Sequence, residues 1–350
     1  MQKWNRGIQF LGLKFIAALV IFSFFVPGEA IAAENVTLFV TSESTDRIGV
    51  YRGEVPALKR VKRIRTGRNP HNMGISPNGR WVVSGDRLAE QLSVIDTKSL
   101  KRIAVVKTGK HPHDLNFSAD SKILYVGHER ETFINVFETG TWKKRSAIEV
   151  GLAQHDISLS PDGKELWFTV TNQPYRKGLP RVGIVSLTDP QKKVQMLDSG
   201  RNAHDVIFGP AGRIVWITNG GFIGYPDPYV NFLDPKTRRV LGQIRVGRYP
   251  FHGPKRGRDG DYLPVDAKQM WFSDRRTSSV IAVDIASRKI ASSVPVGKGP
   301  FHVAVTPKGV LFVANNESNS VTIIDGSAKA ILSTLRVDKK PHGLTVLLNP

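Results

Sequence analysis

The chain has 350 residues, no cysteine and a formal net charge of +20 at pH 7. The absence of cysteine excludes disulfides, thiolate metal sites and cysteine nucleophiles. With 40% hydrophobic residues the chain can form a large core, and its positive charge favours anionic partners.

The first 32 residues have the features of a secretory signal peptide. Three basic residues surround or precede a 12-residue apolar run at 15–26, and the small-residue pattern Ala30-Ile31-Ala32 follows. The run is too short to span a membrane comfortably. We expect cleavage after Ala32, a periplasmic or secreted mature protein, and no membrane span in the mature chain. Cleavage removes three basic residues and Glu29, which leaves a charge of 47 − 29 = +18.

A short stretch that contains a histidine recurs along the rest of the chain, most clearly as Pro112-His113-Asp114-Leu115-Asn116-Phe117-Ser118. Its histidine is found at His71, His113, His155, His204, His252, His302 and His342. The steps between copies are 42, 42, 49, 48, 50 and 40 residues, and a period of this size built from short apolar strands indicates a repeat architecture.

Each repeat is predicted to form four strands. In the copy at 110–151, apolar and polar residues alternate in segments 114–118, 123–126, 133–137 and 146–150. Proline–glycine turns such as Ser76-Pro77-Asn78-Gly79 separate the first strand from the second. Tryptophans recur in the second strands and are predicted to lie in the core: Trp81, Trp167, Trp216 and Trp271.

The segments Leu124-Tyr125-Val126 and Leu311-Phe312-Val313-Ala314-Asn315 resemble the Tyr-Val-Thr-Asn run of YVTN-type β-propeller repeats. The resemblance covers residues 36–348. It implies an all-β fold, a seven-bladed β-propeller of four-stranded antiparallel blades, in a single domain at 33–350. Residues 36–66 supply only three strands, so we expect the C-terminal strand at 344–348 to join the N-terminal blade and close the ring. A monomer is expected.

In such a propeller, the connections that carry the histidines and the loops between second and third strands open on one face. This face is therefore the predicted site. Two insertions, at 172–181 and 219–228, belong to it and could cover the mouth. Basic residues that precede the histidines would form a positive rim: Arg68, Lys110, Arg201, Arg248, Lys298 and Lys340.

The seven histidines fall into two alignment columns. Five share one column, which holds Phe251 and Phe301 in the other two blades, where His252 and His302 come one residue later. Since consecutive strand residues point to opposite sides, this predicts two unlike groups of histidines. The later column otherwise contains Asn72, Asp114, Asp156, Asp205 and Gly343, which predicts a polar mouth of His, Asp and Asn.

The first functional hypothesis is a metal site. Neutral imidazoles bind copper, zinc, iron or nickel, and neighbouring aspartates could orient them. All seven recurring histidines are candidate ligands, with copper or another transition metal as the ion. The plan is similar to that of nitrous oxide reductase, whose propeller presents histidines to a copper cluster. This chain lacks the cysteines of that enzyme's second copper site.

The second hypothesis is a haem-type tetrapyrrole. In repeat type and export the chain resembles propellers of the haem d1 class, which includes nitrite reductase and its assembly factors. That resemblance implies one axial histidine, with Lys255, Arg256 and Arg258 available to bind the cofactor's carboxylates.

Both hypotheses predict an exported binding protein with a role in electron transfer, cofactor handling or redox chemistry. The partners expected are the metal or metallocofactor and a periplasmic redox protein. The alternative is a non-catalytic scaffold that binds an acidic protein, an anionic polymer or nucleic acid on the same face, although no nucleic-acid-binding motif is present. The sequence contains no Ser-His-Asp order, phosphate loop or dinucleotide fingerprint, so no catalytic residue is assigned and enzymatic activity is left open.

Overall fold

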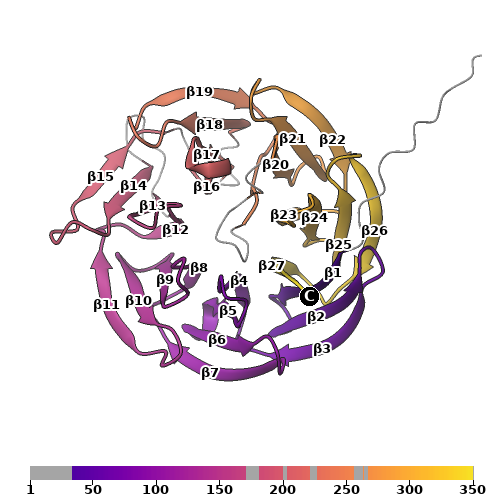
Figure 1. Cartoon of the computed structure of the whole chain (residues 1–350), viewed down its shortest axis with the longest axis horizontal. Coiled ribbons are helices and arrows are strands. Elements are labelled where there is room, and N and C mark those ends of the chain that lie inside the picture. The colour runs from indigo at the N-terminus through magenta and orange to yellow at the C-terminus, as the bar shows by residue number, and fades with distance from the viewer. Residues whose placement is uncertain are drawn as a thin grey trace, which may run out of the picture. The chain divides into compact units, whose positions relative to one another are not determined.

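The computed structural model describes residues 34–170, 181–199, 203–220, 227–255, 263 and 267–349. The predicted signal peptide, Arg256, Arg258 and most of both insertions lie outside these residues. Seven small antiparallel sheets surround a central axis (Figure 1). The predicted seven-bladed β-propeller is therefore confirmed.

The blades are numbered along the chain, and their strands are given from the axis outwards. Blade 1 contains β27 (Pro341–Leu348), β1 (Asn35–Ser42), β2 (Arg47–Glu54) and β3 (Lys59–Arg65). Blade 2 contains β4 (Pro70–Ile75), β5 (Trp81–Asp86), β6 (Gln91–Asp96) and β7 (Lys101–Lys107). Blade 3 contains β8 (Pro112–Phe117), β9 (Ile123–His128), β10 (Phe133–Glu138) and β11 (Lys144–Glu149). Blade 4 contains β12 (Gln154–Leu159), β13 (Glu165–Val170), β14 (Val182–Ser186) and β15 (Val194–Leu197).

Blade 5 contains β16 (Val206–Phe208), β17 (Val215–Thr218), β18 (Tyr229–Leu233) and β19 (Val240–Arg245). Blade 6 contains β20 (Gln269–Asp274), β21 (Ser279–Asp284) and β22 (Ile290–Pro295). Blade 7 contains β23 (Pro300–Val305), β24 (Val310–Asn315), β25 (Ser320–Asp325) and β26 (Ala330–Arg336). Two short 3₁₀ turns are also present, η1 (Arg87–Ala89) and η2 (Pro210–Gly212).

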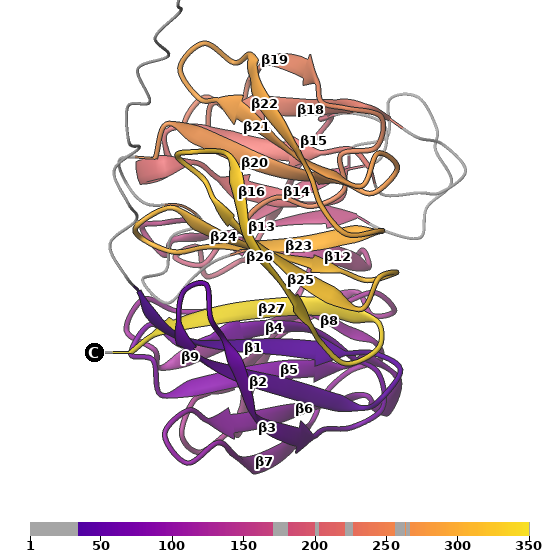
Figure 2. The ribbon, with the colours of Figure 1, turned by 90° about the vertical axis from the view of Figure 1, so that its right-hand side faces the viewer.

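The two ends of the chain share blade 1. Strand β27 pairs antiparallel with β1, from Val36 opposite Leu348 to Val40 opposite Leu344 (Figure 2). The C-terminal strand therefore takes the innermost position that the N-terminal segment lacks, as predicted, and every blade is held on both sides by a neighbour.

The core lies between neighbouring blades and is formed mainly by second and third strands. Trp167 and Trp216 are completely buried, and Trp81 and Trp271 are 6% and 3% exposed, which confirms them as core residues. The outer strands are mostly exposed; in β3 only Ile64 is buried.

Blade 6 departs from the predicted four strands. In its described part, the innermost position is taken by an irregular segment at 249–255, in which the Phe251 amide donates to the Ser273 carbonyl at 2.8 Å. Pro254 then pairs in parallel with Val303 of blade 7, and the Lys255 amide donates to the Val303 carbonyl. The chain thus leaves its own blade directly after His252. Gly253 permits this route, since a Cβ atom there would lie 2.2 Å from Ile207.

The innermost strands share a β-bulge at the histidine. In β4, Pro70 pairs with Asp86 and Met73 with Ser84, so both His71 and Asn72 lie opposite Gly85 alone. The registers of β8, β12, β23 and β27 shift at the equivalent place. A bulge bends the strand and re-aims its side chains. The prediction that adjacent columns point to opposite sides was therefore wrong, because His71 and Asn72 both contact His113.

Candidate functional site

Seven aromatic side chains, one from each blade, form a closed ring at one end of the axis. Consecutive ring centroids are 3.6 to 5.1 Å apart around the whole circle. The members, in order, are His342, His71, His113, His155, His204, Phe251 and Phe301. These are the residues of the first alignment column, so the column predicted from the sequence forms one layer. We call this layer the mouth ring.

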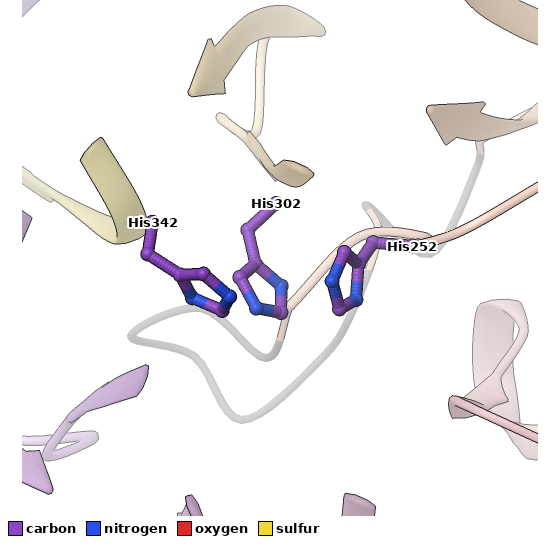
Figure 3. A group of neighbouring side chains, drawn as sticks. All are labelled: His252, His302 and His342. Carbon is purple, nitrogen blue, oxygen red and sulfur yellow. The ribbon is translucent and has the colours of Figure 1, made fainter. Parts of the chain in front are cut away.

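His252 and His302 lie against the mouth ring on the side of its two phenylalanines. Their centroids are 3.8 Å apart, and that of His302 is 4.9 Å from that of His342. Figure 3 shows the three imidazoles His252, His302 and His342 side by side. Each offers a nitrogen within 4.8 Å of those of the other two. We call these three residues the three-histidine cluster.

The three-histidine cluster contains buried nitrogens without a hydrogen-bond partner among the described residues. They are Nε2 of His252, both nitrogens of His302, and Nδ1 of His342. The three residues are between 1% and 3% exposed. Because an unpaired buried polar atom costs about 1–3 kcal/mol, four such atoms in one cluster make the three-histidine cluster a candidate ligand site.

Six of the seven recurring histidines have a lowered pKa and are neutral at physiological pH. Burial disfavours the charged ring and lowers the pKa well below its usual value in five residues: His71, His113, His155, His302 and His342. Burial likewise lowers the pKa of His252 to about 3, although Asp205 acts against the shift. Neutral imidazoles have free lone pairs and are competent metal ligands.

Asp205 orients His252. Its two carboxylate oxygens each lie 3.1 Å from Nδ1 of His252, and Oδ1 lies 3.0 Å from Nδ1 of His204. An ionised carboxylate accepts hydrogen bonds only, so Nδ1 of His252 carries the proton and Nε2 keeps its lone pair. A carboxylate behind a histidine is the usual support of a metal-binding imidazole.

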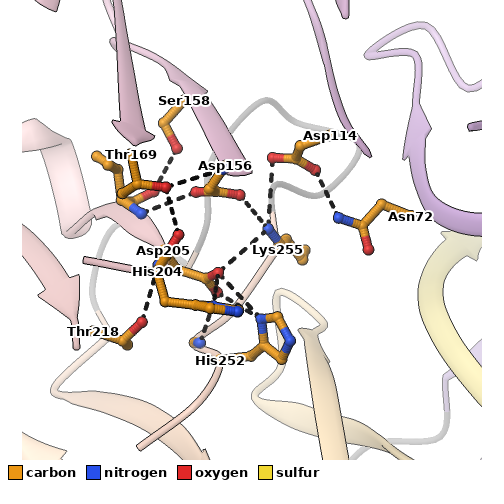
Figure 4. A network of polar contacts seen from close by, with 12 residues as sticks. Asn72, Asp114, Asp156, Ser158, Thr169, His204, Asp205, Thr218, His252 and Lys255 are labelled. Carbon is orange, nitrogen blue, oxygen red and sulfur yellow. Dashed lines mark hydrogen bonds and ion pairs between the residues drawn. The ribbon is translucent and has the colours of Figure 1, made fainter. Parts of the chain in front are cut away.

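Below the cluster, Lys255 lies among three aspartates (Figure 4). Its ammonium is 2.5 Å from Asp156, 3.5 Å from Asp114 and 4.0 Å from Asp205. The structure therefore places the Lys255 ammonium on protein carboxylates, while its assignment to a cofactor carboxylate stays a prediction. Arg256 and Arg258, predicted for the same role, lie outside the described residues.

Above the mouth ring is a depression of about 640 Å³. Six of the seven recurring histidines line it, and His302 lies behind them. Of the five predicted rim residues that the structure describes, Lys340 alone lines it, and Arg201 lies outside the described residues. Arg87 and Arg275 line it without having been predicted. The sequence contained a signal for them, since the residue directly after the second strand reaches the depression in five blades. These residues are Glu43, Arg87, Glu129, Arg275 and Asn316.

Two of these residues add carboxylates beside mouth-ring histidines. Glu43 lies 2.5 Å from Nδ1 of His71, and Glu129 lies 3.6 Å from Nε2 of His113. Both belong to further clusters whose ligand atoms lie within 4.8 Å of one another. His128 lies outside the recurring set: it ends β9, is completely buried, and its Nε2 lies 2.8 Å from the Thr108 hydroxyl.

Comparison with known proteins supports the propeller fold. The Cytochrome D1 heme domain family matches residues 46–206, from blade 1 into blade 5. The comparison with curated proteins gives no match. No helix in the described residues is long and apolar enough to cross a membrane.

Solved structures share the fold at low identity. Periplasmic gluconolactonase PpgL of Pseudomonas aeruginosa has a TM-score of 0.70 and 18% identity, covering 91% of this chain and all of that one. Kuenenia stuttgartiensis hydrazine synthase has a TM-score of 0.69 and 18% identity, covering 87% and 98%. Dihydro-heme d1 dehydrogenase NirN in complex with DHE has a TM-score of 0.65 and 14% identity, covering 88% and 74%. The chain is thus a seven-bladed β-propeller with a partial match to the Cytochrome D1 heme domain family.

Proposed function

We propose that this propeller binds one transition-metal ion of the copper or zinc type through His252, His302 and His342. The observation that supports this most directly is the group of four unpaired buried nitrogens on three neutral imidazoles. Three imidazoles suit a borderline divalent ion and leave a coordination position open. His252 and His342 line the depression, from which a water, a substrate or the donor of a partner would reach the ion.

The test is metal binding by purified protein stripped of metal with a chelator. Titration calorimetry with Cu²⁺ and with Zn²⁺ should give one tight site per chain. Electron paramagnetic resonance of the Cu²⁺ form should show nitrogen ligands. His302→Ala should weaken binding by roughly 100-fold, because removing one of three ligands leaves an incomplete site. His111→Asn is the matched control, since His111 lies outside the three-histidine cluster and asparagine tolerates its φ of 50°.

No stoichiometric ion in the wild type would overturn the proposal. Equal affinity in His302→Ala and wild type would place the ion elsewhere and overturn the assigned ligands.

A haem-type tetrapyrrole is the second candidate, favoured by the Cytochrome D1 heme domain match and by the mouth itself. The depression is lined on one side by the aromatic rings of Tyr249, Phe251 and Phe301, with Arg275 lying 4.8 Å above the Phe301 ring. These groups fit a planar anionic ligand. Adding haem to metal-free protein should then give a red-shifted Soret band with one haem per chain. Replacing the histidine that serves as the axial ligand should abolish this band. A spectrum of unbound haem would exclude this candidate.

We further propose that the protein is exported and acts in the periplasm. The predicted signal peptide supports this, as does the resemblance in fold to a gluconolactonase named as periplasmic. Fractionation of cells that express the full chain should recover a periplasmic product whose N-terminus follows Ala32.

A further inference from the structure

The aspartates around Lys255 form a cage of oxygen atoms, which we call the aspartate cage: Asp114, Asp156 and Asp205. They come from three consecutive blades, and their side chains are 5%, 3% and 1% exposed. Burial, with Asp114 and Asp205 close by, raises the pKa of Asp156, while Lys255 acts against this shift. Ionised carboxylates buried this close together repel each other strongly unless a cation lies between them. The cation here is the ammonium of Lys255, itself 15% exposed (Figure 4).

The cage is held in place by the surrounding backbone. The amide of Val206 donates to Asp156 at 2.9 Å, that of Ile157 to Asp114 at 3.4 Å, and that of Gly253 to Asp205 at 3.3 Å. Burial opposes the charge on Lys255, but the three aspartates outweigh it and raise its pKa well above the usual value. The carboxylates that fix the ammonium are therefore themselves held by backbone amides, unlike the partners of a flexible lysine at the surface.

The cage and the three-histidine cluster prefer different ions. Three carboxylates form a donor set for hard cations such as Ca²⁺, Mg²⁺ and Mn²⁺, whereas imidazoles suit copper and zinc. Asp205 links the cage to the cluster, because its carboxylate lies near the Lys255 ammonium and also contacts Nδ1 of His252. A hard cation in the cage would therefore change the support of the first histidine of the cluster.

We propose that Lys255 determines which metal ions the site binds. Its ammonium occupies the aspartate cage and so prevents hard divalent cations from binding there. The imidazole nitrogens are then the donors that an entering metal finds. This inference rests on the proposed metal-binding function. It also makes Asp205 a positioning residue, which holds His252 with Nε2 directed toward the cluster. The unusual path of segment 249–255, which leaves blade 6 for blade 7, serves to deliver this one ammonium.

The test is Lys255→Met, which keeps the length of the side chain and removes its charge. Mn²⁺ binding, measured by loss of the free-ion paramagnetic resonance signal, should be weak in the wild type and at least roughly 100-fold tighter in the variant. Lys255→Met/Asp156→Asn should lose most of this gain, because one carboxylate is removed. Lys298→Met removes the charge of an exposed lysine that does not line the depression, and this variant should bind Mn²⁺ as the wild type does.

Each outcome decides the proposal. Folded Lys255→Met with unchanged Mn²⁺ affinity overturns it, as does a wild type that already binds Mn²⁺ as tightly. If Lys255→Met is unfolded without ions, millimolar Mn²⁺ or ethylammonium should restore its circular dichroism, and failure of both contradicts the cage. The Cu²⁺ titration of the wild type is independent, so its failure would remove the metal-binding function while the Mn²⁺ result still tests the cage.

Discussion

At the scale of single residues, the mouth is a place where histidines are held neutral by burial. Seven histidines would ordinarily add charge to a protein that is already strongly basic. Here six of them have a lowered pKa, and they contribute lone pairs in place of charge. This arrangement makes the site suited to cations even though the whole chain is positive.

The same burial predicts acid sensitivity. The six histidines are neutral in the folded protein, while in the unfolded chain they bind protons below pH 6.5. Stability is therefore fully present above about pH 7 and is lost as pH falls through 6.5, by up to about 1.4 kcal/mol per pH unit for each histidine. Urea denaturation of metal-free protein at pH 7.5, 6.5 and 5.5 measures this slope.

The matched variant is His302→Phe, which removes one of the titrating groups. Its loss of stability between pH 7.5 and 5.5 should be smaller than that of the wild type by about 1–2 kcal/mol. Stability that stays constant or rises on acidification would contradict the assignment of neutral buried histidines.

At the scale of secondary structure, the bulged innermost strand is the unit that builds the site. Each bulge sets two consecutive residues of the innermost strand opposite one small residue of the second strand. These opposite residues include Thr41, Gly85, Gly127, Thr169 and Ala314. In blade 1 the later alignment column holds Gly343, and a Cβ atom there would lie 2.6 Å from the His71 carbonyl.

Thr169 illustrates how a bulge is stabilised. Its hydroxyl accepts from the Asp156 amide at 3.0 Å and donates to the His204 carbonyl at 2.7 Å. Thr169→Val keeps the shape and leaves both buried groups unpaired, so unfolding should require about 1–3 kcal/mol less free energy. Thr188→Val, at an exposed position, should change stability by less than about 0.5 kcal/mol. Equal urea midpoints for the two variants would contradict this role.

At the scale of the whole molecule, closure of the ring through β27 holds the site together. Strand β27 supplies His342 to both the mouth ring and the three-histidine cluster, and it completes the blade that begins the chain. Stability and metal binding should therefore depend on the same strand, although it is farthest along the chain from β1.

Removal of residues 341–350 should unfold the whole propeller and not merely trim its end. Strand β1 would lose its pairing partner, and the packing of β27 against β4 and β23 would be lost. Far-ultraviolet circular dichroism and resistance to protease measure this. Adding a synthetic peptide of residues 340–350 should restore part of the signal. A truncated protein with the melting temperature of the full chain would show that the ring does not need this closure.

The sequence by itself determined the number of blades, the closing strand, the core tryptophans and the common face of the histidines, because these depend on local alternation and on the repeat period. It also grouped Phe251 and Phe301 with the five aligned histidines and separated His252 and His302 from them. The tertiary structure alone decided that both columns face the axis, since a bulge depends on pairing with a second strand. It also placed Lys255, which lies where the chain passes from blade 6 to blade 7, beside aspartates of blades 3, 4 and 5. The sequence could not predict this, because contacts between residues about 50 to 140 positions apart follow no local pattern.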